Sequence, residues 1–192
     1  MISNLAQRAS SFTSNAFLVS GARTALVDTG ANFDIVGAIR ERVDTLDAVV
    51  LTHTHRDHVH NLPAVTEAFD VEVWGFDPSF DGVDHEITDE STLTLGDDEY
   101  VALHTPGHKE DHLCFYATEP EILFAGDLVF QNGSFGRTDL PEGDRETLIR
   151  SIDRLLEWID PSLRELHVGH GPSITNSPYD HVELASQMAR RV

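Results

Sequence analysis

Four short apolar runs of this sequence each end in a loop that carries histidine or aspartate. The runs are Ala48–Leu51, Tyr100–His104, Ile122–Phe124 and Leu166–Val168. Short runs rich in β-branched and aromatic residues predict buried strands. In layered α/β folds, polar side chains at strand ends are where sites are usually assembled. The sequence therefore predicts a site built from four loops that are far apart along the chain.

Further strands and helices are expected between these four runs. The runs Ala16–Val19 and Thr24–Val27 flank the turn-forming Ser20-Gly21 and predict a hairpin. Helical spacing predicts a helix that begins at Asn32 or Asp34 and reaches Val43, and further helices at Leu62–Phe69, Arg145–Ile159 and Tyr179–Arg191. Short apolar runs predict strands at Val71–Trp74 and Leu113–Tyr116. This alternation predicts an α/β fold of two mixed sheets stacked face to face with helices outside. We expect one domain over residues 1–192, with no clear pattern between Phe76 and Asp98.

The chain is strongly acidic. It has 33 acidic and 13 basic residues, a net charge of -20, and one lysine, Lys109. Repulsion from phosphate backbones makes nucleic acid an unfavourable partner. Asp-rich, Lys-poor surfaces resemble those of proteins from salt-loving organisms, in which a high electrolyte concentration screens self-repulsion.

We therefore expect the melting temperature of the protein to rise between low and molar KCl, because added salt screens repulsion among its carboxylates. A thermal-unfolding series in KCl measures this, and a melting temperature that stays level or falls would contradict it.

No window approaches the roughly 20 consecutive apolar residues of a membrane span, and the N-terminus lacks a basic start followed by an apolar run. We expect a soluble, cytoplasmic protein with no membrane partner. Cys114, the single cysteine, lies in the apolar run LCFY and is expected to be a buried, inert thiol. The sequence leaves open whether the chain forms a homodimer.

The first of the four loops is the densest, with LTHTHRDHVH placing four histidines and an aspartate between Leu51 and His60. The candidate ligands from all four loops are His53, His55, Asp57, His58, His108, Asp127 and His170. Imidazoles with a few carboxylates suit Zn²⁺, Fe or Mn, and the set is large enough for two divalent ions with positions left for water. The other histidines are interpreted as structural: His60, His85, His104, His112, His167 and His181.

The pattern His53-x-His55-x-Asp57-His58, with Asp28-Thr-Gly30 upstream and His108, Asp127 and His170 downstream, resembles the metallo-β-lactamase superfamily from about residue 15 to residue 172. The resemblance implies a four-layer αββα sandwich. It implies that one metal takes His53, His55 and His108, that a second takes Asp57, His58 and His170, and that Asp127 bridges them. Asp28 would then support the ligands, although a cap or turn role stays open.

The segment Gly136-Arg-Thr-Asp-Leu-Pro-Glu-Gly-Asp144 resembles a stretch of short glyoxalase II-like hydrolases, and its GRTD portion also resembles persulfide dioxygenases. In this segment Arg137 and Asp139 either pair with each other or contact substrate. The resemblance implies hydrolysis of a small-molecule thioester by a hydroxide generated between two metals, with Asp57 and Asp127 orienting it. Only 22 residues follow His170. We therefore expect the C-terminal extension of larger glyoxalase II enzymes to be missing, which leaves the thiol carrier open.

Two alternatives remain. The first is an iron-dependent persulfide dioxygenase, with one Fe(II) held by His53, His108 and Asp127. Hydrolysis is favoured over this alternative because the ligands for a second metal, Asp57, His58 and His170, are all present, and because Leu140-Pro141 stands where the dioxygenase pattern has other residues. The second is a metal-binding protein without turnover, which seven ligands for two ions disfavour. Flavodiiron electron transfer is disfavoured because the resembling cluster has Glu where this chain has His55. The missing export signal disfavours a secreted β-lactamase, and the negative charge disfavours an RNA-processing nuclease.

Overall fold

The computed structural model describes residues 1–191, with every side chain among them except that of Arg8. The chain divides into two compact units. Unit 1 comprises residues 1–87 and 93–99, and unit 2 comprises residues 88–92 and 100–192. The single domain over residues 1–192 stays a prediction.

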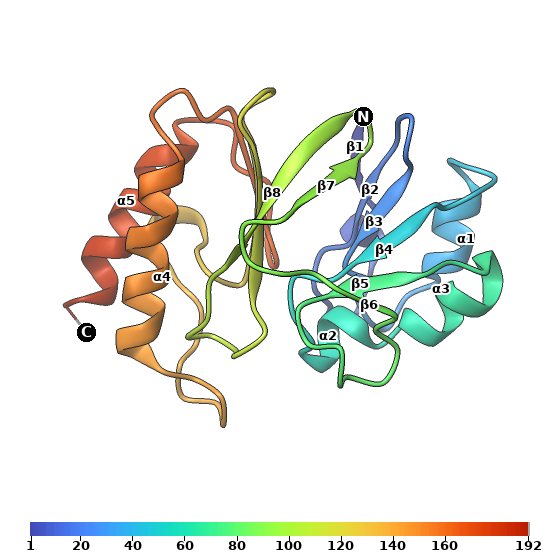
Figure 1. The fold of residues 1–192 in the computed structure, drawn as a ribbon, viewed down its shortest axis with the longest axis horizontal. Helices are drawn as coiled ribbons and strands as arrows, with labels where there is room; N and C mark the ends of the chain where they lie inside the picture. Colours follow the sequence, from blue (N-terminus) through green and yellow to red (C-terminus); the bar gives the residue numbers. More distant parts are fainter. Residues whose placement is uncertain (192) are drawn as a thin grey trace. The chain divides into compact units, whose positions relative to one another are not determined.

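A six-stranded mixed sheet forms most of unit 1, in the order β1-β2-β3-β4-β5-β6 (Figure 1). The strands are β1 (Ile2–Asn4), β2 (Phe17–Val19), β3 (Ala25–Val27), β4 (Ala48–Val50), β5 (Val73–Gly75) and β6 (His85–Glu86). The pairs β1–β2 and β2–β3 are antiparallel, and β3, β4, β5 and β6 run parallel. The helices are η1 (Leu5–Arg8), α1 (Ile35–Arg40), α2 (Arg56–Val59) and α3 (Leu62–Phe69).

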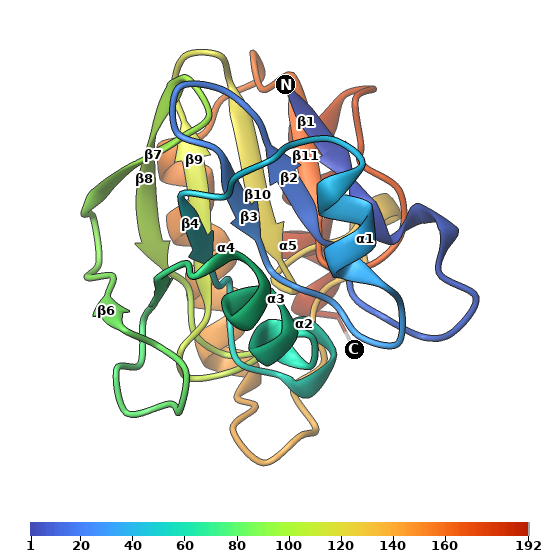
Figure 2. The same ribbon diagram turned by 90° about the vertical axis from the view of Figure 1, so that its right-hand side faces the viewer.

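The core of unit 1 lies between its sheet and the helices α1 and α3, which Figure 2 shows beside β3 and β4. Leu26 and Val49 from the sheet belong to one apolar cluster with Ile39 of α1 and Val65 of α3, and all four side chains are fully buried. Of the two predicted starts, Asn32 and Asp34, the structure shows the second: the Asp34 carboxylate caps α1 by accepting a hydrogen bond from the Gly37 N–H at 2.9 Å.

A five-stranded mixed sheet has the order β11-β10-β9-β8-β7. Its strands are β7 (Thr92–Leu95), β8 (Asp98–His104), β9 (Leu113–Ala117), β10 (Ile122–Gly126) and β11 (Glu165–Val168). The pairs β8–β9 and β9–β10 are antiparallel, whereas β10 and β11 are parallel. The helices of unit 2 are η2 (Gln131–Gly133), α4 (Arg145–Trp158) and α5 (Pro178–Ala189).

The core of unit 2 joins this sheet to α4 and α5. Leu103 and Leu123 from the sheet belong to one buried cluster with Ile152 of α4 and Val182 of α5. Asp144, the last residue of the GRTDLPEGD segment, caps α4 by accepting a hydrogen bond from the Thr147 N–H at 2.7 Å. The two mixed sheets with attached helices confirm the predicted fold class.

The structure corrects several predicted boundaries. The helix α1 ends at Arg40 instead of reaching Val43, and β5 begins at Val73, two residues later than predicted. The sequence interpretation missed β1, α2, β6 and β7. These four elements contain two to four residues each, which is too short for a period of 2 or 3.6 to be recognised.

Within residues 1–191, none of the helices combines the length and the apolar character needed to cross a bilayer.

Candidate metal centre

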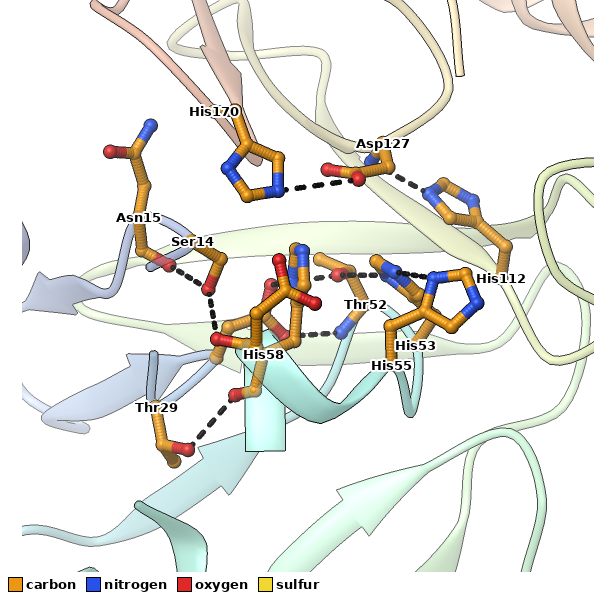
Figure 3. A network of polar contacts seen from close by, with 12 residues as sticks. Ser14, Asn15, Thr29, Thr52, His53, His55, His58, His112, Asp127 and His170 are labelled. Atoms are coloured by element: carbon orange, nitrogen blue, oxygen red, sulfur yellow. Dashed lines mark hydrogen bonds and ion pairs between the residues drawn. The ribbon is translucent and has the colours of Figure 1, made fainter. Parts of the chain in front are cut away.

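The loop after β4 carries four of the predicted ligands in unit 1. His53 and His55 lie on an extended segment, and Asp57 and His58 belong to the single turn of α2. Backbone contacts hold this turn in place (Figure 3). The His58 carbonyl accepts hydrogen bonds from the Thr29 N–H at 2.8 Å and the Thr29 hydroxyl at 2.9 Å, and the Ser14 hydroxyl donates to the Asp57 carbonyl at 3.0 Å.

His53 and His55 direct ring nitrogens toward a common point. The Nε2 atom of His53 lies 3.1 Å from the Nδ1 atom of His55. Two imidazole ligands of a tetrahedral zinc ion, each about 2.0–2.1 Å from the metal, have nitrogens about 3.3 Å apart. The pair in unit 1 therefore fits two ligands of one ion.

Asp28 orients the imidazoles of this loop through hydrogen bonds with Thr52 and His58. Its Oδ2 atom accepts hydrogen bonds from the Thr52 hydroxyl at 2.7 Å and from His58 Nδ1 at 2.8 Å, and its Oδ1 atom accepts from the Thr52 N–H at 2.8 Å. Because Nδ1 of His58 carries the hydrogen, Nε2 keeps the lone pair that a metal requires.

The same carboxylate assigns the tautomer of His53 through Thr52. The Thr52 hydroxyl donates its only hydrogen to Asp28, so it accepts from His53 Nδ1 at 3.1 Å. Nε2 of His53 therefore also keeps its lone pair. Asp28 itself lies in the left-handed region, with φ 57°, and is buried. Its side chain contacts Thr52 and His58, which agrees with the supporting role. Its left-handed backbone directly after β3 also agrees with the turn interpretation.

Replacing Asp28 by asparagine should weaken metal binding by about 10–100-fold, which is the usual effect of removing a carboxylate that orients a ligand histidine. The amide cannot accept all three hydrogen bonds, so the tautomer of His58 is no longer imposed. Chelator competition on the purified protein measures the affinity. Asp34→Asn is the matched control, because asparagine caps a helix as well as aspartate does. Equal affinities in both variants would contradict this role.

Unit 2 contributes three predicted ligands from loops after β8, β10 and β11. The Oδ2 atom of Asp127 lies 3.4 Å from Nε2 of His108. It also lies 3.5 Å from Nε2 of His170, a contact that Figure 3 marks. These separations also match adjacent ligands of one metal ion, which are about 3.3–3.5 Å apart for ordinary bond lengths. One carboxylate oxygen between two imidazoles is the arrangement that a bridging ligand needs.

Backbone geometry explains how Asp127 comes to lie there. Gly126 adopts φ 47°, and the register between β10 and β11 shifts between Phe124 and Gly126. The Gly126 carbonyl then accepts a hydrogen bond from the Gly169 N–H at 2.7 Å, which ties the Asp127 loop to the loop of His170.

The GRTD segment supports His108. The Arg137 carbonyl lies 2.8 Å from His108 Nδ1 and accepts its hydrogen, which leaves Nε2 with a lone pair. The Arg137 side chain forms two 2.9 Å hydrogen bonds with the Asp139 carboxylate. This contact lowers the pKa of Asp139 and raises that of Arg137. Of the two roles left open by the sequence, internal pairing is therefore present, and substrate contact stays a prediction.

The structure thus brings together His53, His55 and His58 with Asp28 in unit 1, and His108, Asp127 and His170 in unit 2. It places Asp57 on α2 with its backbone carbonyl bound by Ser14.

One residue interpreted as structural contacts a predicted ligand directly. His112 is fully buried, and its Nε2 atom accepts a hydrogen bond from the Asp127 N–H at 3.0 Å. Its place immediately before the apolar run LCFY was the available signal, because a histidine at the start of a buried strand needs a buried partner.

Two other buried groups behave as predicted. Burial lowers the pKa of His167 to about 4, and His167 stacks on Phe124. Cys114 is buried, as predicted, and burial raises the pKa of its thiol to about 12.

Comparisons with known proteins agree with this geometry. The model of the metallo-beta-lactamase superfamily matches residues 11–80 and 75–174. "Probable metallo-hydrolase YqgX" of Bacillus subtilis is 32% identical over 179 residues, covering 81% of this chain and 83% of that protein. "Hydroxyacylglutathione hydrolase GloC" of Haemophilus influenzae is 33% identical over 175 residues, covering 79% and 81%.

A solved structure shows the same fold. The crystal structure of the B3 metallo-beta-lactamase BLEG-1 superimposes with a TM-score of 0.76 at 28% identity, covering 93% of this chain and 99% of that one. With a family model matched over most of its length and relatives above 30% identity, this chain belongs to the metallo-β-lactamase superfamily.

Proposed function

We propose that this metallo-hydrolase cleaves thioesters, and that its predicted ligands hold two divalent metal ions. In this proposal His53, His55 and His108 bind one ion, Asp57, His58 and His170 bind the other, and Asp127 is shared. The observation that carries it is the hydrogen-bond pattern, since Asp28, Thr52 and the Arg137 carbonyl leave Nε2 of three histidines with a lone pair. Neutral imidazoles presented in this way suit Zn²⁺, with Fe or Mn as alternatives.

When bound, such ions lower the pKa of a water molecule toward neutrality and polarise the carbonyl oxygen of an ester. The protein supplies the remaining requirements. Asp57 and Asp127 add negative charge that offsets part of the charge of two divalent ions, and Asp28 keeps His53 and His58 in the binding tautomer. The leaving thiolate needs little help from a general acid, because a thiol has a pKa of about 8.5.

The name of a relative supports the choice of thioester. The Haemophilus influenzae protein that is 33% identical is called a hydroxyacylglutathione hydrolase, and this chain covers 81% of its length. The pattern of the GRTDLPEGD segment points to the same class. We therefore propose a small acyl-thiol conjugate as the substrate, and we further propose that the protein acts in the cytoplasm without a nucleic acid or membrane partner.

The test combines element analysis with turnover of two substrates. The purified holoenzyme should contain two equivalents of metal per chain and should hydrolyse S-lactoylglutathione without consuming oxygen. One iron per chain, together with oxygen uptake on glutathione persulfide, would replace this proposal by the dioxygenase alternative. Two metals without hydrolysis of any thioester or lactone would favour binding without turnover.

A further inference from the structure

A chain of buried hydrogen bonds runs from the backbone of Asp127 back to the backbone of Ala125. The Asp127 N–H donates to His112 Nε2 at 3.0 Å, and His112 Nδ1 lies 2.8 Å from the Thr105 hydroxyl. That hydroxyl donates to Cys114 Sγ at 3.3 Å, and the thiol donates to the Ala125 carbonyl at 3.6 Å. The side chains of Thr105, His112 and Cys114 belong to fully buried residues.

The direction of every hydrogen bond in this chain is determined. A backbone N–H only donates, so His112 Nε2 must carry a lone pair and Nδ1 the hydrogen. The Thr105 hydroxyl therefore accepts from His112 and has its own hydrogen available. The Leu103 carbonyl lies 3.5 Å from that hydroxyl, which is long for an O–H donor, whereas 3.3 Å is a normal distance to sulfur.

Cys114 completes the chain as a donor. Because burial raises its pKa to about 12, Cys114 remains a thiol at neutral pH and keeps the hydrogen that it donates to Ala125. The sole cysteine of the sequence thus has a hydrogen-bonding role besides filling the core.

The two ends of this series of hydrogen bonds, the Asp127 N–H and the Ala125 carbonyl, lie on either side of Gly126. Gly126 has φ 47° and is the residue at which β10 turns into the Asp127 loop. Two residues of this series, Thr105 and His112, also close a second loop. The Thr105 N–H donates to the His112 carbonyl at 2.9 Å, and this pair closes the loop that carries His108. Thr105 and His112 thus lie at the base of the His108 loop, where their side chains also contact each other, and His112 and Cys114 contact the backbone at the base of the Asp127 loop.

We propose that Thr105, His112 and Cys114 form a positioning unit that holds Asp127 and His108 in the geometry needed to bind metal. The inference rests on the proposed metal ligands, but it concerns residues outside the ligand set. None of the three side chains contacts the metal or the substrate in this proposal. They act through the backbone of Asp127 and through the loop of His108.

Thr105→Val and Thr105→Ser provide the sharpest test. Valine has nearly the shape of threonine but neither accepts from His112 nor donates to Cys114, whereas serine keeps the hydroxyl. We expect Thr105→Val to weaken zinc affinity, measured by chelator competition, by about 10–100-fold, and Thr105→Ser to stay within about threefold of the parent protein. In the metal-free proteins, hydrogen exchange of the Asp127 amide should be at least about tenfold faster in Thr105→Val than in Thr105→Ser.

A second pair of variants covers the case in which Thr105→Val does not fold. Cys114→Ser keeps a donor to Ala125 and Cys114→Ala removes it, so only Cys114→Ala should weaken zinc binding, by about threefold or more. Ser173→Ala is the matched control. It removes the 2.7 Å contact between a hydroxyl and another buried histidine of unit 2, His167, and should leave zinc affinity unchanged.

The positioning role is overturned if Thr105→Val binds zinc like the parent protein, or if Thr105→Ser is as impaired as Thr105→Val. These measurements need no substrate. If zinc affinity and amide exchange respond as expected and no thioester is hydrolysed, the proposed function fails while the positioning unit stands. If thioesters are hydrolysed and Thr105→Val keeps parental zinc affinity, the positioning unit fails while the proposed function stands.

Discussion

Replacing Asp127 by alanine is expected to lower kcat/KM for thioester hydrolysis by roughly 10³-fold, equivalent to about 4 kcal/mol of transition-state stabilisation. The reason is geometric. One oxygen of Asp127 lies 3.4 Å and 3.5 Å from the nitrogens of His108 and His170, so a single substitution removes the proposed shared ligand. Initial rates on S-lactoylglutathione, with metal content determined on the same samples, measure the effect.

The fold should survive this substitution. The backbone N–H of residue 127 still donates to His112, and the side chain removed belongs to no apolar cluster. The melting temperature of the metal-free variant should therefore lie within about 3 °C of the parent protein, equivalent to about 1 kcal/mol for a chain of this size. Asp180→Ala, an exposed carboxylate in the first turn of α5, is the control and should keep full activity. An active Asp127→Ala variant would refute the proposed ligand set.

Replacing Gly136 by alanine should damage the site and the fold together. A Cβ atom at this position would lie 2.1 Å from the Asp127 carbonyl oxygen and 3.0 Å from the His108 Cβ. The segment must shift, and the 2.8 Å contact between the Arg137 carbonyl and His108 is then lost. We expect kcat/KM to fall by about 10–100-fold, as when other partners of ligand histidines are removed.

The same substitution should cost about 1–3 kcal/mol of unfolding free energy, because it overpacks a buried position. For a chain of this length, that corresponds to a melting temperature lower by about 2–12 °C. Ser134→Ala, two residues away and exposed, is the control and should change neither quantity. Parental activity and melting temperature in Gly136→Ala would show that the turn is not constrained as the structure indicates.

The longer elements were predictable because their signals are local. Arg145–Trp158 forms a helix whose buried residues Leu148, Ile152 and Leu155 recur every three or four positions. The hairpin of β2 and β3 follows from two apolar runs around Ser20-Gly21. By contrast, β6 pairs only two residues with β5, and its His85 stacks on Trp74. A strand of that length depends on its neighbour in the sheet, which no local pattern reveals.

The candidate ligands were predictable as well, since each follows an apolar run that forms a strand. Their supports were only partly predictable. The resemblance implied that Asp28 supports the ligands, but not that it does so through Thr52 and His58, which lie 24 and 30 residues away in the sequence. The contact of the Arg137 carbonyl with His108, across 29 residues, was not predicted. The local sequence of His112 indicates that it needs a buried partner but not which one, because that partner, the Asp127 N–H, lies 15 residues further along the chain.

The amino-acid sequence by itself determined the chemistry of this protein: which side chains are available as ligands, in which order they follow the strands, and which superfamily they indicate. That information is local, since it depends on residue types a few positions apart. The tertiary structure alone decided which ring nitrogen of His58 and of His108 keeps its lone pair. A tautomer is set by the hydrogen-bond partner of the other nitrogen, and in His58 and His108 that partner arrives from a distant segment through folding.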